Sequence, residues 1–140
     1  MKALTLKPDW AMLMFQGDKT VEFRTWKTNY RGDIVICSSA KKMRGCISGN
    51  ALMVANLKEI VPFRKAHLEA AAMDTMPDQK GFAWIFDNFR MLYPQPVKGK
   101  LGLFDVDIPI KYVPDELTED EADEFIETFL IPLIFQPAQQ

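Results

Sequence analysis

Short segments rich in β-branched and aromatic residues recur along this chain, and turns containing glycine or proline separate them. This spacing is typical of a compact β-barrel. Two small helices accompany the strands, one running from Pro8 to a C-terminal cap at Gly17 and one over residues 67–73. Residues 94–100 are expected to form a loop, because prolines and glycines are disfavoured in a central strand. The predicted class is mainly β with small helices (α+β), with strands at 3–6, 19–23, 33–38, 51–57, 82–86, 91–93 and 103–108.

The second of these strands carries the run Gly17-Asp18-Lys19-Thr20-Val21-Glu22-Phe23-Arg24. If the run is extended, Glu22 and Arg24 share one face of the strand, and the apolar Val21 and Phe23 share the other. The apolar pair can then enter a core while the charged pair lines a cleft. The alternative is a charged strand that simply faces water.

Basic residues from separate segments could join this strand in an anion-binding cleft. Lys19 and Arg24 come from the strand itself, Arg31 from the loop after it, and Lys98 from a distant loop. Lysine offers phosphate a point charge and arginine a planar fork, so the combination suits a nucleotide backbone. We therefore expect RNA or a nucleotide or nucleoside as the partner.

Aromatic and hydroxyl side chains are candidates for the rest of this cleft. Trp26, Tyr30 and Trp84 could stack on bases, although Trp84 could equally be a core residue. Ser38 could reach the cleft from the end of the strand at 33–38, or could only satisfy a turn. Trp10 is expected in the core.

Glu22 has three possible roles. It could pair with Arg24 and hold the guanidinium in place, or accept a hydrogen bond from a base edge such as a cytosine amino group. It could also act as a general base with Lys19 on a hydrolysable bond. The sequence leaves the three roles open.

The C-terminal segment has the pattern of an amphipathic helix. Thr118 and Glu121 form a capping box, apolar residues follow at helical spacing, and Pro132 should end the helix near Ile131. This divides the chain into a barrel domain over residues 1–112 and an acidic helical extension over 113–140. The extension is expected to dock on its own barrel or to form a homodimer with a second copy.

Charge is distributed unevenly along the chain. Residues 1–100 hold 16 Lys/Arg and 9 Asp/Glu, whereas residues 101–140 hold one Lys and 10 Asp/Glu. A basic body is compatible with a phosphate-bearing partner. Alternatively, the two parts neutralise each other, or the acidic segment covers the basic cleft.

Several classes of function are disfavoured by what the sequence lacks. It contains no apolar run of about 18 residues, so we expect no membrane partner. The two cysteines lack metal-ligand spacing and there is one histidine, so we expect no metal site and no cofactor. The start of the sequence lacks the apolar region of a secretory signal, and reduced cysteines fit a cytoplasmic protein.

A set of motifs follows in a fixed order over residues 3–110. They are Leu4-Thr5-Leu6-Lys7-Pro8 with Trp10, Gly17-Asp18-Lys19-Thr20-Val21-Glu22-Phe23-Arg24, Tyr30-Arg31-Gly32, Ile34-Val35-Ile36-Cys37-Ser38-Ser39, Phe82-Ala83-Trp84, and Pro96-Val97-Lys98-Gly99-Lys100-Leu101-Gly102-Leu103-Phe104. Together they resemble the ASCH domain family, a relative of the PUA fold of RNA-binding proteins. The resemblance implies a PUA-like β-barrel with a cleft for RNA or nucleotides.

Some members of that family are acetylcytidine amidohydrolases, which implies an alternative function as a small hydrolase, either amidohydrolase or ribonuclease-like. Lys19 matches the lysine proposed to act there, but Glu22 stands where those enzymes have a nucleophilic threonine. A carboxylate cannot replace that hydroxyl without a change of chemistry. Glu69 is the candidate for the more distant glutamate, and whether the chain is an enzyme stays open.

Overall fold

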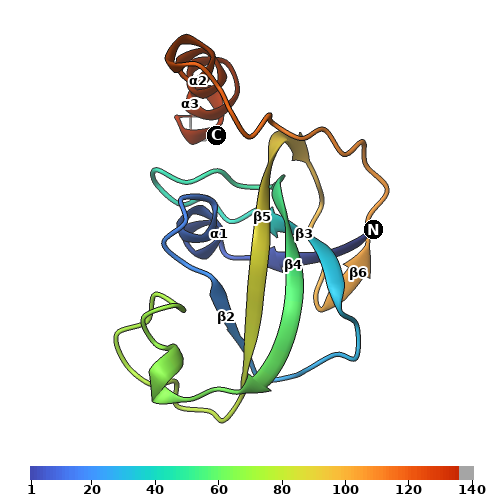
Figure 1. Cartoon of the computed structure of the whole chain (residues 1–140), viewed down its shortest axis with the longest axis vertical. Helices are drawn as coiled ribbons and strands as arrows, with labels where there is room; N and C mark the ends of the chain where they lie inside the picture. Colours follow the sequence, from blue (N-terminus) through green and yellow to red (C-terminus); the bar gives the residue numbers. More distant parts are fainter. Residues whose placement is uncertain (136–140) are drawn as a thin grey trace.

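The computed structural model of the chain describes residues 1–135, and the last five residues of the predicted extension lie outside them (Figure 1). Within the described residues, a six-stranded sheet has the strand order β2-β5-β4-β3-β1-β6. The elements, in chain order, are β1 (Lys2–Leu6), α1 (Pro8–Phe15), β2 (Val21–Arg24), β3 (Gly32–Ser38), β4 (Asn50–Pro62), the short 3₁₀ turn η1 (Lys65–His67), β5 (Phe82–Pro96), β6 (Leu103–Asp105), α2 (Glu119–Phe125), the π-helical turn η2 (Ile126–Leu130) and α3 (Ile131–Ile134).

The long strands β4 and β5 form the centre of the sheet and curve along their length (Figure 1). Their antiparallel register shifts at three places, and such bulges bend and twist a sheet. The sheet therefore curls into an open half-barrel with β2 and β6 at its edges. The helix α1 packs Ala11, Met12 and Met14 into the main core, beside residues of β1, β3 and β4. The prediction of a mainly β fold with small helices is confirmed.

The predicted strands at 82–86 and 91–93 and the predicted loop at 94–100 are corrected by β5. The first two are one strand, which continues to Pro96. β5 pairs with β2 only over residues 82–85, so on that side the strand beyond Ile85 has no ladder with β2. Pro94 falls where the register with β4 shifts between Ala51 and Met53, and proline is tolerated at such a bulge. The loop of lysines and glycines that begins after Pro96 is correspondingly shorter than predicted.

The predicted helix over residues 67–73 is wrong. The chain makes only the short turn η1 and then further turns. Its carbonyl groups serve other partners: Ala70 O accepts hydrogen bonds from the backbone N–H groups of Thr20 and Val21, and Ala71 O accepts one from the Lys19 ammonium. Contacts with β2 thus override the helix propensity of the alanines.

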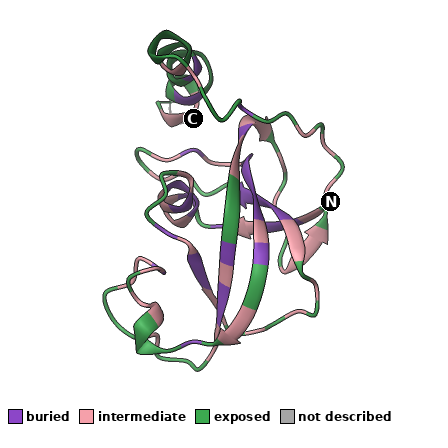
Figure 2. Ribbon diagram, viewed as in Figure 1, coloured by how far each residue is buried: buried purple, intermediate pink, exposed green. Residues whose placement is uncertain are grey.

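Burial follows the curved sheet, as Figure 2 shows by its purple segments along β3, β4 and β5. Ile34 and Ile36 face the main core, whereas Val35 and Cys37 belong to a second cluster on the opposite face. The strand predicted at 33–38 is therefore present as β3, and its residues 34–38 are buried. Both cysteines are free.

The C-terminal helical segment begins with the predicted capping box, in which Glu121 N donates to Thr118 Oγ1 at 3.1 Å. Phe125 and Phe129 pack their rings on Tyr93 of β5, at 5.6 and 4.9 Å between centroids. The helix therefore contacts its own barrel. It does not stop near Ile131, because Pro132 falls in the first turn of α3 after the wider π-helical turn. No helix in residues 1–135 is long and apolar enough to cross a membrane.

Gly81 allows a close approach between the start of β5 and β2. A Cβ atom at this position would lie 2.6 Å from Arg24 O and would overlap the ring of Phe23. The Phe23 ring is itself packed edge-on against Phe63 at 5.1 Å. We expect Gly81→Ala to lower the free energy of unfolding by about 1–3 kcal/mol, measured by urea denaturation. Lys80→Ala, at an exposed neighbour, should change it by less than about 0.5 kcal/mol. Equal stability of the two variants would contradict the clash.

Candidate functional site

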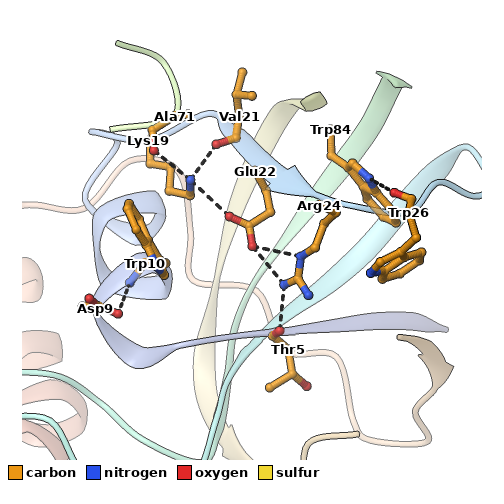
Figure 3. Close-up of polar contacts among 10 residues, drawn as sticks. All are labelled: Thr5, Asp9, Trp10, Lys19, Val21, Glu22, Arg24, Trp26, Ala71 and Trp84. Atoms are coloured by element: carbon orange, nitrogen blue, oxygen red, sulfur yellow. Dashed lines mark hydrogen bonds and ion pairs between the residues drawn. The ribbon is translucent and has the colours of Figure 1, made fainter. Parts of the chain in front are cut away.

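The charged strand β2 separates its side chains as its alternation predicts. Val21 and Phe23 pack with Phe63 and Ala83 in an apolar cluster. Glu22, on the other side, is paired with Arg24, with Glu22 Oε2 2.9 Å from Arg24 Nη2 and 3.1 Å from Nε. Figure 3 shows this pair between Trp10 and Trp26.

Lys19 is buried and fully hydrogen bonded. Its ammonium donates to Val21 O at 2.7 Å and to Ala71 O at 2.9 Å, and lies 3.2 Å from Glu22 Oε1. Its Nζ also lies 4.6 Å from the centre of the Trp10 ring. Burial lowers the pKa of Lys19, and the charge and hydrogen bond of Glu22 oppose that shift. The buried Lys19 thus holds both Glu22 and the loop around Ala71 in place beneath the protein surface.

Arg24 connects β2 to β1. Its Nη2 donates to Thr5 O at 2.9 Å as well as to Glu22. The remaining guanidinium nitrogen, Nη1, makes no hydrogen bond to any of residues 1–135. The two bonded nitrogens fix the plane of the guanidinium, which leaves Nη1 available to a ligand.

A pocket of about 360 Å³, here called the tryptophan pocket, opens over the Glu22–Arg24 pair. It combines two half-buried indoles, two cations and the carboxylate of Glu22. Its lining residues are Thr5, Lys7, Trp10, Glu22, Phe23, Arg24, Thr25 and Trp26. Indole rings beside fixed polar groups are suited to a planar aromatic ligand.

A second pocket of about 450 Å³, here called the lysine-loop pocket, adjoins the first. The two pockets share Thr5, Lys7 and Arg24 as lining residues. The rest of its lining consists of Leu6, Ser39, Ala40, Lys98, Gly99, Lys100, Leu101 and Gly102. Arg24 of β2 and the loop that carries Lys98 therefore line the same pocket.

Several predicted site residues lie away from both pockets. The guanidinium of Arg31 bonds to carbonyls of its own loop, at Thr28 and Tyr30. The Tyr30 hydroxyl donates to Asp33 O, and the Ser38 hydroxyl accepts from the backbone N–H of Asn50. None of the three residues lines the tryptophan pocket or the lysine-loop pocket.

Trp84 and Glu69 are also separated from the pockets. Trp84 is fully buried, and its indole N–H donates to Trp26 O at 3.1 Å. It therefore supports Trp26, whose ring it meets edge-on at 4.8 Å. Glu69 is exposed in the turns after η1, and no contact joins it to Lys19. Lys19, Glu22 and Arg24 are brought together, with Lys98 nearby across the lysine-loop pocket.

Sequence reasoning does not identify several lining residues of these pockets, among them Trp10, Thr5 and Lys7. Trp10 was expected in the core, but it is half-buried and lines the tryptophan pocket. Thr5 and Lys7, at the end of β1, line both pockets. The signal in the sequence is Lys7-Pro8, which marks the point where the first strand ends and a helix begins, so that the side chains around it lie at the end of the strand.

Comparisons with known proteins agree with the fold. The model of the ASCH domain family matches residues 4–108. Similar solved structures are ASCH from Zymomonas mobilis, with 16% identity, a TM-score of 0.56, and coverage of 91% of this chain and 94% of that chain, and a tyrosine-to-phenylalanine mutant of the same protein, with 16% identity, a TM-score of 0.59, and coverage of 91% and 96%. The chain matches no curated protein sequence.

Proposed function

Since this chain belongs to the ASCH domain family and has its PUA-like fold, we propose that it binds single-stranded RNA or a nucleotide in the tryptophan pocket. The observation that carries the proposal is the grouping of Trp10, Trp26, Glu22 and Arg24 around one pocket. Each supplies an interaction that a nucleotide needs. Double-stranded nucleic acid would keep its bases stacked inside the helix and away from the indoles.

The indoles provide stacking surfaces on either side of the charged pair (Figure 3). Trp26 is held by its edge-on contact with the buried Trp84. A base stacked on a tryptophan contributes about 1–3 kcal/mol to binding, with little dependence on its identity. Preference among bases then comes from the polar groups of the pocket.

Glu22 is the polar group suited to reading a base edge. Its Oε2 accepts from two nitrogens of Arg24, whereas the one partner of its Oε1 in the described part of the chain is the Lys19 ammonium. Oε1 therefore has an acceptor site for an amino group of cytosine, adenine or guanine. Arg24, beside it, offers Nη1 to a phosphate or to a base carbonyl oxygen.

Fluorescence anisotropy with labelled single-stranded RNA tests this function. We expect affinity for single strands but not duplexes, and a fall in affinity as salt increases. Trp26→Leu should weaken binding about 5–150-fold, because it removes stacking of about 1–3 kcal/mol but keeps an apolar side chain against Trp84. Phe129→Leu is the matched control, an aromatic residue far from both pockets. Absence of binding to any single strand, or equal losses in the two variants, would contradict the proposal.

Hydrolysis of a modified nucleoside or of RNA is the second candidate. It rests on Glu22, the carboxylate that lines the tryptophan pocket, with Lys19 behind it. The ammonium of Lys19 is turned to Glu22 and two carbonyls, which favours a role in fixing Glu22 over attack on a ligand. Turnover of acylated nucleosides or cleavage of RNA by the wild type, lost in folded Glu22→Asp, would support this candidate. Absence of turnover in the wild type would exclude it for those substrates.

A further inference from the structure

We propose that the lysine-loop pocket is a subsite for a phosphate monoester. The ligand is then a nucleoside monophosphate, either free or as the phosphorylated end of an RNA strand, with its base in the tryptophan pocket. This inference rests on the proposed function for the position of the base. Four observations on the lysine-loop pocket carry it.

The first observation is an unbalanced positive charge. Four cationic side chains line the pocket, Lys7, Arg24, Lys98 and Lys100, and none of its described lining residues is acidic. Within residues 1–135, the three lysines make no ion pair and no side-chain hydrogen bond. Arg24 has Glu22 as its counter-charge, whereas the three lysines have none among the described residues, and such like charges raise the local potential and attract an anion.

The second observation is the free donor of Arg24. This residue lines both pockets, and its Nη1 has no partner in the described part of the chain. Glu22 and Thr5 O hold the other two nitrogens. A group placed at the junction of the pockets would therefore meet an oriented guanidinium donor, which is a strong phosphate contact.

The third observation is an unsatisfied hydroxyl at the same junction. Thr5 Oγ1 is buried and has no hydrogen-bond partner among the described residues. Gly99 packs over it so closely that a Cβ there would lie 2.9 Å from Oγ1. Buried hydroxyl groups without partners are rare and costly. The Thr5 hydroxyl is therefore an unpaired donor directly beneath the Gly99 segment, and both residues line the lysine-loop pocket.

The fourth observation is the size and continuity of the two pockets. Their volumes of about 360 and 450 Å³ are each in the range of small-molecule sites, about 300–1,000 Å³. They meet at Thr5, Lys7 and Arg24, so a ligand can place an aromatic group in one and an anion in the other. Three lysines without counter-charges, beside the free Nη1 of Arg24, suit a monoester, which carries about −1.5 to −2 charges at neutral pH, better than an internal phosphodiester with one.

Isothermal titration calorimetry with matched ligand pairs tests the subsite. The probes are the nucleosides cytidine and adenosine, their 5′- and 3′-monophosphates, and one RNA oligomer with a 5′-hydroxyl or a 5′-phosphate. We expect at least one phosphorylated ligand to bind about tenfold or more tightly than its unphosphorylated partner. A gain with free monophosphates indicates a nucleotide as the ligand, and a gain only with the oligomer indicates a strand end.

The double variant Lys98→Ala/Lys100→Ala should abolish this gain without loss of folding, because both lysines are exposed. Lys58→Ala/Lys111→Ala, which removes two exposed lysines outside the pockets, should retain it. Equal affinity of the wild type for phosphorylated and unphosphorylated ligands would overturn the subsite but leave the proposed function intact. Absence of binding to all of them would overturn both.

Discussion

Glu22→Gln should lower the free energy of unfolding by about 3–5 kcal/mol near neutral pH, which is the cost of removing one partner of a buried ion pair. Glu22 is the anion beside Lys19, whose side chain is 1% exposed, and beside Arg24. Glutamine fills the same volume but carries no charge. The ammonium of Lys19 would then keep its two carbonyl partners and the Trp10 ring, but no contacting anion.

The loss should depend on pH through Lys19. Burial already lowers the pKa of Lys19 below its ordinary value of 10.5, and the charge of Glu22 raises it again. Without Glu22 this pKa falls further in the folded protein. Between the lowered folded pKa and 10.5, the unfolded chain binds more protons than the folded one, so stability rises with pH. The deficit of Glu22→Gln relative to the wild type should therefore shrink as the pH is raised from about 7 to about 9.5.

Urea denaturation of the two proteins at both pH values measures this. Asp105→Asn is the matched control, since it also removes a carboxylate from an ion pair, here with Lys2 at an exposed position. Exposed pairs contribute about 0–1 kcal/mol, so this variant should unfold close to the wild type at either pH. A Glu22→Gln variant as stable as Asp105→Asn would show that the buried network does not support the fold.

The two faces of β2 could be predicted from the sequence, whereas the depth of Lys19 could not. Alternation alone separates Glu22 and Arg24 from Val21 and Phe23, and the structure agrees. Lys19 is buried because Ala71, from a loop distant in sequence, supplies a carbonyl oxygen at 2.9 Å. The sequence predicts a helix there, over residues 67–73, and that prediction gives no sign that a carbonyl of this segment meets the Lys19 ammonium. No local sequence pattern predicts a hydrogen bond between residues as far apart in the chain as Lys19 and Ala71.

The aromatic residues show a similar division. Tryptophan content identifies candidates for stacking, but burial decides which of them a ligand can reach. Trp84 lies on β5, which pairs with β2 on one side and with β4 on the other. Trp10 lies instead on α1, the helix that directly follows β1 in the chain. Arg31 matches the family motif, and within residues 1–135 its side-chain hydrogen bonds go to carbonyls of its own loop. The order of the motifs thus predicts the fold and the strand that carries the candidate site. Which aromatic and basic side chains point into the pockets could be seen only in the structure.

Arg24→Ala should cause the largest loss of ligand affinity of any single change in the pockets. Arg24 lines both of them and holds Glu22 and Thr5 in one hydrogen-bonded chain. A hydrogen bond to a charged group contributes about 1.5–3 kcal/mol, which corresponds to about 10–150-fold in affinity. The variant also leaves Glu22 with one fewer cation, so its negative charge would repel a phosphate nearby.

Arg24→Lys separates charge from geometry, because lysine keeps the cation but cannot bond Glu22 and Thr5 O through a planar fork. We expect it to recover only part of the affinity for single-stranded RNA that Arg24→Ala loses, in anisotropy measurements at one fixed salt concentration. Arg31→Ala is the matched control for charge, since it removes one arginine of the motif that lies outside both pockets. Its affinity should stay within about twofold of the wild type, because a distant charge is screened over about 8–10 Å. Equal losses for Arg24→Ala and Arg31→Ala would mean that net charge, and not the oriented guanidinium between the pockets, determines binding.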